Sequence, residues 1–276
     1  MQDPGRILFI GGGNMAAALI GGLLRRGISA QSLSVVDPDA ARREDLRVQF
    51  GLIAHADAGA FAATADVVLL AVKPQQMRSV LVDLAPRIGD PKALVISIAA
   101  GIDHASIGRW LTRPQPIVRA MPNRPALQGF GATGLFAPPT VSALDRDRAE
   151  AILGAVGLTV WVEHEEQMDV VTALSGSGPA YFFLLMEALE SAARDLGLPA
   201  DAAHRLTVET ALGAAQMAHA DTASLATLRE QVTSKGGTTA AALAEFEAAG
   251  FGAIVARALG AARRRSAELA AEFAPT

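Results

Sequence analysis

The stretch VTSKGGTT, residues 232–239, carries four hydroxyl side chains and two adjacent glycines directly before an alanine-rich helical pattern. A helix start needs a single capping hydroxyl, which one of the two final threonines can provide, so the other polar groups are left for another purpose. Gly236 and Gly237 let the backbone turn, and N–H and O–H groups gathered at a helix N-terminus form a cradle for a small anion. The stretch predicts a carboxylate-binding site formed by the donors that the cap leaves over.

A second motif, FIGGGNMAAAL at residues 9–19, contains the spacing Gly11-x-Gly13-x-x-Ala16 between an apolar run and a helical pattern. Gly11 permits a tight turn, Gly13 lets the backbone approach a pyrophosphate, and Ala16 lets the helix lie close to the strand. The motif predicts dinucleotide binding. The alternative is a glycine-rich turn between a strand and a helix that binds nothing.

Asp37 stands at the end of the second predicted strand, where the acidic residue of a dinucleotide-binding fold meets the ribose. A carboxylate at this position suits a free 2′-hydroxyl and repels a 2′-phosphate, so Asp37 favours NADH over NADPH. Arg42 and Arg43 follow one helical turn later. They either offset that repulsion in part or belong to a solvated helix face.

Two further loops follow predicted strands: AVKP at residues 71–74 and MPNRP at residues 121–125. Ligands of open α/β sheets bind at the carboxyl ends of the strands, so we expect at least one of these loops to be functional. Pro74 is also suited to the first position of the next helix.

The stretch LSGSGPAYFF, residues 174–183, places two serines, two glycines and Pro179 within a helical region. A proline inside a helix breaks or kinks it, which predicts that one helix ends here and another begins. The stretch is not a GxSxG nucleophile elbow, because neither serine has a glycine two residues away on both sides.

These motifs are positioned by an alternation of strands and helices in the first part of the chain. Apolar, β-branched runs such as ADVVLLAV are typical of buried parallel strands. Their alternation with helices indicates a right-handed parallel sheet covered on both faces, which is a Rossmann-type domain. Strands are predicted at residues 6–10, 32–37, 52–55, 65–72, 93–100 and 116–122, the last of which closes the series, and helices at 14–26, 39–50, 75–84 and 102–111.

After Trp161 the strand patterns stop, and the rest of the chain has helical patterns throughout. The change predicts a dinucleotide-binding domain of residues 1–161 and an all-α domain of residues 162–276. The helices of the second domain are predicted at residues 168–196, 200–220, 222–232, 239–249 and 252–273.

The composition excludes several classes of protein. The absence of cysteine from the 276 residues removes disulfides, thiol nucleophiles and cysteine-ligated zinc, and the five histidines form no close pair, so no metal site is expected. The net charge of −4 is scattered, unlike the basic face of a nucleic-acid-binding protein. With no membrane-length apolar run and no signal-peptide pattern at the N-terminus, we expect a cytoplasmic protein.

The segments IGGGNMA, AVKPQQM, MPN, ALSGSGPAYFF and QVTSKGGTTAAAL follow the order found in pyrroline-5-carboxylate reductases, and the chain resembles that family over essentially its whole length. The resemblance implies NADH- or NADPH-dependent reduction of the cyclic imine 1-pyrroline-5-carboxylate to L-proline, the last step of proline biosynthesis. It also implies a C-terminal all-α dimerisation domain that intertwines with a second subunit, and a homodimer that assembles further in some members.

The resemblance also implies roles for individual residues. Ser234 and the N–H groups of the glycine loop would hold the substrate carboxylate, and Thr239 would bond the ring nitrogen without being the sole proton source. The implied substrate-binding residues are Ser234, Gly236, Gly237, Thr238 and Thr239. With Asp37, the implied cofactor-binding residues are Ile10, Gly11, Gly12, Gly13, Asn14, Met15, Ala71, Val72, Lys73, Pro74, Ile98, Ala99 and Ala100.

Three features depart from the family pattern, one of which is the absence of the usual asparagine from the exit loop of the third strand, where this chain reads HADAG at residues 55–59. Lys235 stands where the family often has proline, and it either adds positive charge near the anion or points to solvent. Many members of the family prefer NADPH and carry small or basic residues where this chain has Asp37. The resemblance therefore favours NADPH while Asp37 favours NADH.

Two alternative functions stay open. A β-hydroxyacid dehydrogenase also joins a Rossmann-type domain to helices, but it uses a lysine on a helix as acid and base. Lys235, the single lysine after residue 92, lies in a glycine loop instead. The other alternative is a non-catalytic nucleotide-sensing dimer, and the predicted anion cradle argues against it.

Overall fold

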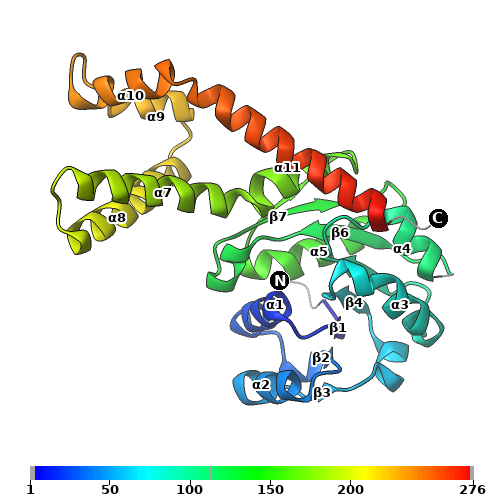
Figure 1. Cartoon of the computed structure of the whole chain (residues 1–276). Coiled ribbons are helices and arrows are strands. Elements are labelled where there is room, and N and C mark those ends of the chain that lie inside the picture. Colours follow the sequence, from blue (N-terminus) through cyan, green and yellow to red (C-terminus); the bar gives the residue numbers. More distant parts are fainter. Residues whose placement is uncertain (1–3, 112, 274–276) are drawn as a thin grey trace. The chain divides into compact units, whose positions relative to one another are not determined.

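The computed structural model describes residues 4–111 and 113–273, and the chain forms two compact units. The first unit comprises Met1–Ser177 together with Ala261–Thr276, and the second comprises Gly178–Gly260. Figure 1 shows the strands and helices of each unit. The last strand ends at Trp161, and the division into domains of residues 1–161 and 162–276 stays a prediction.

An eight-stranded sheet forms the centre of the first unit, in the order β3-β2-β1-β4-β5-β6-β7-β8. Neighbouring strands are parallel except β6 and β7, which are antiparallel. The strands are β1 Ile7–Ile10, β2 Leu33–Val36, β3 Ala54–His55, β4 Val67–Leu70, β5 Leu94–Ser97, β6 Ile117–Met121, β7 Gly131–Phe136 and β8 Gly157–Trp161. Strands β2 and β3 are added on one side of β1, and β4 and the later strands on the other. The carboxyl ends of β1 and β4 therefore flank the point where the strand order reverses.

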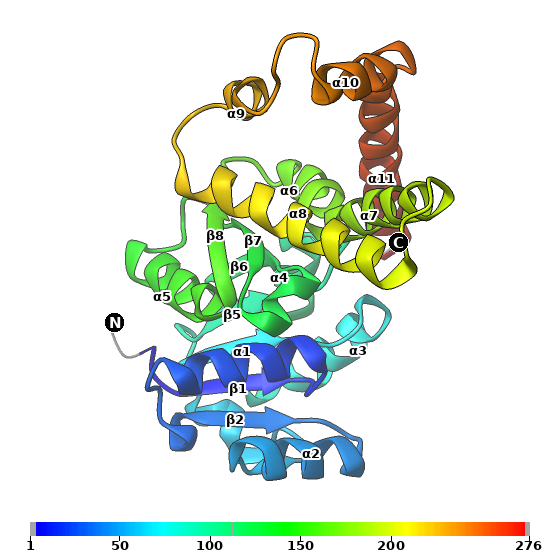
Figure 2. The ribbon, with the colours of Figure 1, turned by 90° about the vertical axis from the view of Figure 1, so that its left-hand side faces the viewer.

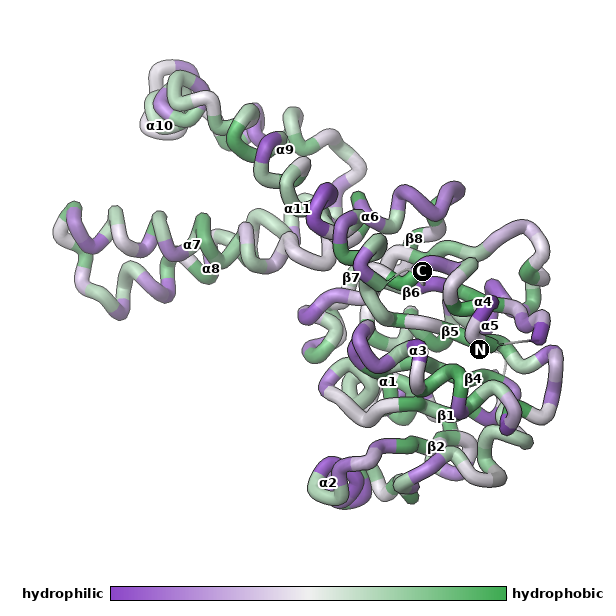
Figure 3. The backbone as a smooth tube through the Cα atoms, turned by 45° about the vertical axis from the view of Figure 1, so that its right-hand side comes forward, coloured by the Kyte–Doolittle hydropathy of each residue, from purple (hydrophilic) through white to green (hydrophobic). Residues whose placement is uncertain are grey.

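Helices cover both faces of this sheet and bury two apolar clusters (Figure 2). One face is covered by α1, α2 and α5, and the other by α3 and α4. Figure 3 shows α2 as mostly hydrophilic, in keeping with Leu46 as its one buried residue. The helices of this unit are α1 Asn14–Arg25, α2 Ala40–Phe50, α3 Pro74–Leu84, α4 His104–Leu111, α5 Ala143–Leu153 and α6 Gln167–Val171.

All six predicted strands and all four predicted helices of the first domain are present, with bounds that differ by up to three residues at an end. The prediction that residues 116–122 close the sheet is wrong, because β7, α5 and β8 follow. The sequence of β7, GATGLF, has too few β-branched residues to signal a strand. Its glycines have a packing reason: Gly131 lies opposite Gly157 of β8, and a Cβ on Gly157 would overlap the Gly131 backbone.

The LSGSGP stretch contains the end of a π-helical turn and the joint between two helices. After α6, residues Thr172–Gly176 form this turn, Ser177 N donates to Thr172 O at 2.9 Å, and α7 follows from Gly178. Pro179 lies in the first turn of α7, where a missing N–H is tolerated. The prediction that one helix ends here and another begins is therefore confirmed, with Ser177 as the C-cap of the π turn and Gly178 as the first residue of α7. Single π turns are frequent at functional sites.

The second unit contains α7 Gly178–Asp195 and α8 Ala200–Ala220, which lie side by side as an antiparallel pair in both ribbon views. Next come α9 Leu225–Gln231, α10 Thr238–Ala248 and α11 Phe251–Phe273, whose last residues belong to the first unit. The helix predicted at residues 168–196 is divided at Ser177 into α6 with its π turn and α7, and the other four predicted helices are present with small changes of bounds. Across the described residues, no single helix has the length and apolar character to cross a membrane, and only the bent pair α10–α11 meets that test jointly.

Candidate active site

The carboxyl ends of β1, β4 and β5 bring three predicted cofactor-binding segments together. The N–H groups of Gly11, Ala71 and Ile98 each donate to a carbonyl at the end of an adjacent strand, at 2.8, 2.8 and 3.2 Å. The three segments thus form one continuous edge at the point where the strand order reverses, which is where dinucleotides bind in such sheets. Their contact with a cofactor stays a prediction.

The three glycines of the turn after β1 differ in their steric surroundings. Gly11 has a φ of +96°, and a Cβ on it would lie 2.7 Å from the Ala71 carbonyl oxygen. A Cβ on Gly12 would lie 2.7 Å from a methyl carbon of Leu46. A Cβ on Gly13 would meet nothing within 4 Å, so this direction is open at the N-terminus of α1. A pyrophosphate fits such a cradle, because the free N–H groups of the first helical turn point toward it.

Asp37 ties the end of β2 to the glycine turn. Its Oδ2 accepts the Gly12 N–H at 2.8 Å, and its Oδ1 accepts the Asp39 N–H at 2.9 Å. The Asp37 carboxylate therefore fixes the glycine turn, where the pyrophosphate is predicted to bind. It also lies where the ribose of the cofactor is expected. The spacing of the motif alone does not reveal its role in fixing the turn.

Arg42 and Arg43 are half-buried and hold the same loop, so their interpretation as a solvated helix face is wrong. Arg42 Nε donates to the Gly12 carbonyl oxygen, and its Nη2 lies 3.5 Å from Asn14 Oδ1. Arg43 Nη1 donates to the carbonyl oxygens of residues 37 and 38, at 2.8 and 2.9 Å. Two guanidinium groups thus stand beside the place predicted for the adenosine ribose.

The two other loops at this edge differ in what they hold. Lys73 is exposed and α3 begins at Pro74, as predicted. Asn123 of the MPN motif is only 8% exposed and bridges two segments. Its Nδ2 donates to Ser175 O at 3.0 Å and its Oδ1 accepts the Ala132 N–H at 2.9 Å. The MPN loop thereby holds the π-helical turn that leads into α7.

In the second unit, VTSKGGTT forms a tight turn followed by α10. Gly237 N donates to Ser234 O at 3.0 Å, and Gly236 between them has a φ of +70°. Gly237 is the N-cap of α10 and no side chain caps the helix, so the prediction of a capping threonine is wrong. Both threonines lie inside the first helical turn instead, and their hydroxyls are not used to begin the helix.

The polar groups of this turn point to an anion site. The first helical hydrogen bond of α10 runs from Ala241 N to Gly237 O at 3.2 Å, so the N–H groups of residues 238–240 precede it. In the described chain, no protein group pairs with the hydroxyls of Ser234, Thr238 or Thr239. The Gly237 N–H, implied as a carboxylate donor by the family resemblance, donates to Ser234 in this turn.

A partly buried ion pair that the sequence did not reveal lies where α4 begins. Arg119 Nη1 donates to Glu165 Oε1 at 2.6 Å, and the same oxygen accepts the His104 N–H at 2.6 Å. Burial lowers the pKa of the His104 imidazole, and the Glu165 carboxylate partly opposes that shift. Burial raises the pKa of Asp103, but hydrogen bonds from Ser106 outweigh it and leave the pKa below its usual value. The sequence feature that could have indicated this ion pair is Arg119, a charged residue inside the apolar run PIVRAMP.

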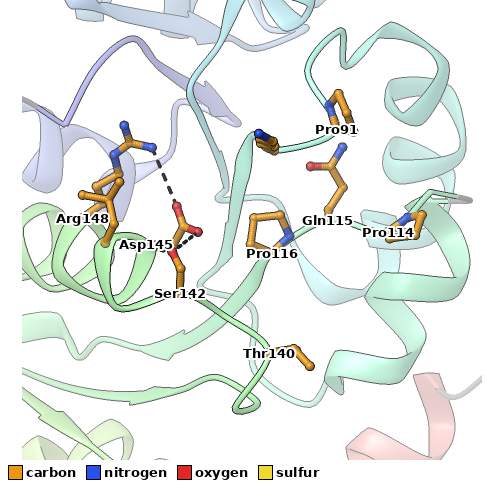
Figure 4. Close-up of a pocket in the computed structure, with 10 residues that line it drawn as sticks. Pro91, Pro114, Gln115, Pro116, Thr140, Ser142, Asp145 and Arg148 are labelled. Carbon is orange, nitrogen blue, oxygen red and sulfur yellow. Dashed lines mark hydrogen bonds and ion pairs between the residues drawn. The ribbon is translucent and has the colours of Figure 1, made fainter.

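A cavity of about 680 Å³ opens at the amino-terminal edge of the sheet, opposite the glycine turn (Figure 4). It contains none of the residues predicted to bind substrate or cofactor. Its walls come from the segments before β5 and β6 and from the start of α5, with Pro91, Lys92, Pro114, Gln115, Pro116, Thr140, Ser142, Leu144, Asp145 and Arg148.

A mostly parallel sheet with a glycine turn at its point of reversal, followed by helices, defines the class of dinucleotide-binding oxidoreductases. Residues 6–101 match the family model for NADP oxidoreductase, coenzyme F420-dependent, and residues 165–269 match that for pyrroline-5-carboxylate reductase dimerisation. The chain is 51% identical to the Pseudomonas aeruginosa pyrroline-5-carboxylate reductase over 273 residues, 99% of each chain. The chain belongs to the pyrroline-5-carboxylate reductase family, and this prediction is confirmed.

Two solved structures agree with this assignment and with the predicted fold class. A Coxiella burnetii pyrroline-5-carboxylate reductase superposes with a TM-score of 0.93 at 43% identity, covering 96% of this chain and 98% of its own. A Plasmodium falciparum pyrroline carboxylate reductase with NADP bound gives a TM-score of 0.84 at 27% identity, covering 98% and 100%. The α/β fold with a Rossmann-type domain and a helical C-terminal part is thus confirmed.

Proposed function

We propose that the protein reduces 1-pyrroline-5-carboxylate to L-proline with NADH or NADPH as the hydride donor. The observation that carries the proposal is the 51% identity with the Pseudomonas aeruginosa reductase over 99% of both chains. The two binding elements agree with it: an open glycine cradle suits a dinucleotide, and the α10 N-terminus suits a small carboxylate.

The residues of the first unit fit a nicotinamide dinucleotide. The open direction at Gly13 receives the pyrophosphate, and the segments 71–74 and 98–100 line the dinucleotide beyond the carboxyl ends of β4 and β5. The bound nicotinamide supplies the hydride. The protein contributes binding and orientation, which can lower the barrier by several kcal/mol when the reacting atoms are held in contact.

In the second unit, the N–H groups of residues 238–240 and the Ser234 hydroxyl bind the substrate carboxylate. Thr239 directs its hydroxyl at the ring nitrogen. The C=N carbon accepts the hydride, the π electrons pass to nitrogen, and the nitrogen ends with a proton. Because a protonated imine is already electrophilic, the reaction needs no strong acid from the protein, in keeping with a turn that offers only hydroxyl and N–H groups.

A steady-state assay with 1-pyrroline-5-carboxylate tests this function, with NADH and NADPH compared in parallel. We expect oxidation of the reduced nicotinamide and formation of proline in equal amounts. Normal cofactor binding without turnover would contradict the proposal and support the alternative of a non-catalytic nucleotide-sensing dimer.

We infer that both cofactors are used, because opposite charges flank the ribose position. Asp37 disfavours a 2′-phosphate, whereas Arg42 lines a cavity of about 240 Å³ beside α1 together with Asn14, Arg25 and Gln49. Guanidinium groups bind phosphate with paired, directional hydrogen bonds, so Arg42 offsets the repulsion from Asp37.

Two substitutions should shift the cofactor preference in opposite directions. We expect Asp37→Asn to raise kcat/KM for NADPH relative to NADH about tenfold, since removing one charge near a phosphate changes binding by about 1.4 kcal/mol. Arg42→Ala should lower the same ratio by a similar factor. Because both substitutions disturb contacts with Gly12, kcat/KM should fall for both cofactors, and this common loss cancels in the ratio of the two kcat/KM values. An unchanged ratio in both variants would show that these residues do not contact the ribose.

Lys235 separates the proposed reductase from a β-hydroxyacid dehydrogenase. It is exposed at the turn before α10, and the proposed reaction gives it no proton to transfer. We expect Lys235→Ala to keep kcat within about twofold of the unaltered protein, as for other surface substitutions. A loss of several orders of magnitude in kcat would instead assign Lys235 as the acid and base of the alternative enzyme class.

We also propose that the second unit forms a homodimer. In the single chain, large apolar side chains of this unit stand exposed, among them Phe182, Phe183 and Leu184 at 68%, 65% and 66%. Contiguous apolar surface of this kind marks a protein interface. The match of residues 165–269 to the dimerisation model supports the proposal. The cytoplasmic location stays a prediction.

A further inference from the structure

The loop between β5 and α4, residues 98–103, is held from two sides by segments that are distant in the sequence. It begins with the three residues that the proposed function places along the cofactor. Its first N–H, of Ile98, donates to the end of β4 at 3.2 Å. Ala99 N then donates to Ser97 Oγ at 3.4 Å, and Ile102 is buried in the apolar cluster of α3 and α4. The loop also lies beside residues after β8 and the end of α11.

Glu165 fixes the far end of this loop. Its Oε1 accepts the His104 N–H and Arg119 Nη1, each at 2.6 Å, and Arg119 is only 9% exposed. Charge-assisted hydrogen bonds are short and directional, and burial of the arginine leaves the carboxylate little freedom. Glu165 therefore places the first residue of α4 relative to β6.

The last turns of α11 lie beside the middle of the loop. Gly101 has a φ of +73°, and a Cβ on it would lie 3.4 Å from Ala270 N. The helix is tied to the sheet unit by Ser266 Oγ, which donates to Asp169 Oδ1 at 2.7 Å, and Ser266 is 5% exposed. Phe273 packs against the apolar cluster that α3 and α4 form with the sheet.

We propose that Glu165 and Ser266 are positioning residues that set the affinity for the nicotinamide cofactor by fixing loop 98–103. The proposal rests on the proposed function, in which residues 98–100 line the cofactor. Glu165 lies on the segment that leads into α7, and Ser266 lies on the helix that returns from the second unit. Along the chain, the same two segments connect the cofactor loop to the unit that carries the carboxylate site.

Three variants and a matched control test this proposal in the full-length protein. Glu165→Ala removes both bonds, Glu165→Gln keeps an acceptor for His104 N, and Ser266→Ala frees α11 from Asp169. The control Glu150→Ala removes the 3.0 Å bond from Trp161 Nε1, which lies outside the loop contacts. For each protein we would measure the NADPH dissociation constant, the KM for 1-pyrroline-5-carboxylate, kcat and the unfolding midpoint.

We expect Glu165→Ala to weaken NADPH binding about tenfold and Ser266→Ala about threefold, with KM for the imine within twofold, because small displacements of a lining segment weaken binding strongly. Glu165→Gln should recover most of the affinity. The control should lower the unfolding midpoint without changing NADPH affinity.

A lower unfolding midpoint with unchanged NADPH affinity in Glu165→Ala and Ser266→Ala would overturn the proposal and leave these residues a purely structural role. If Glu165→Ala does not fold, the Ser266→Ala titration decides by itself. Turnover of the unaltered protein is measured first. Its absence would overturn the proposed reaction, whereas the NADPH titrations would still decide whether Glu165 and Ser266 position the cofactor loop.

Discussion

Replacing Gly13 with alanine should weaken cofactor binding about 10- to 100-fold while leaving the fold intact. A methyl group at this position meets nothing within 4 Å in the protein itself and occupies only the space assigned to the pyrophosphate. Crowding a well-packed contact costs about 1–3 kcal/mol, which corresponds to this range of affinity. Equilibrium titration of NADPH measures the loss of affinity. Thermal unfolding without cofactor should show a change of at most about 1 kcal/mol in the free energy of unfolding.

Two other glycines provide the controls for this experiment. Gly108 lies in α4, and a Cβ on it would have its nearest neighbour at 3.8 Å, so Gly108→Ala should keep NADPH affinity and slightly raise stability. Gly11→Ala should lose both stability and affinity, because Gly11 combines a φ of +96° with a 2.7 Å approach to Ala71. Equal NADPH affinity in Gly13→Ala and the unaltered protein would place the pyrophosphate elsewhere.

The parts of the molecule that sequence patterns predicted best are those governed by local rules. The buried runs before residue 122 form strands because their β-branched and apolar side chains fill a sheet covered on both faces. The glycine turn was likewise predictable from the sequence, since its spacing marks the tight turn at Gly11, where φ is positive and the Ala71 backbone lies close, and the open position at Gly13. β7 and β8 escaped prediction because their glycines serve the close approach of Gly131 and Gly157, which only the pairing of the two strands creates.

The contacts missed in the candidate site depend on segments that are distant in the sequence. Asp37 was expected at the ribose, but its bond to the Gly12 N–H joins residues 25 apart. Ser266 meets Asp169 across 97 residues, and Glu165 meets Arg119 across 46. The prediction that a threonine caps α10 failed for a local reason. Gly237 adopts the N-cap conformation without any side-chain hydrogen bond, which leaves both threonines inside the helix.

The hydroxyl of Thr239 should matter to catalysis although it is not needed for the helix that carries it. We expect Thr239→Val to lower kcat/KM for 1-pyrroline-5-carboxylate about 10- to 100-fold. Removing a hydrogen bond to a charged partner costs about 1.5–3 kcal/mol, and valine keeps the shape of the side chain. NADPH affinity should not change, because the residue belongs to the carboxylate-binding turn of the second unit.

Neighbouring substitutions show whether the loss comes from the hydroxyl or from the helix start. Thr239→Ser retains the hydroxyl and should recover most of kcat/KM. Thr238→Val makes the same replacement of a hydroxyl by a methyl group one residue earlier in α10. It should have little effect on kcat/KM, because only the backbone N–H of Thr238 is assigned to the substrate. If Thr239→Val matches the unaltered protein, the ring nitrogen is held elsewhere. If Thr238→Val loses as much rate as Thr239→Val, valine disturbs the helix start itself, and the hydroxyl has no separate role.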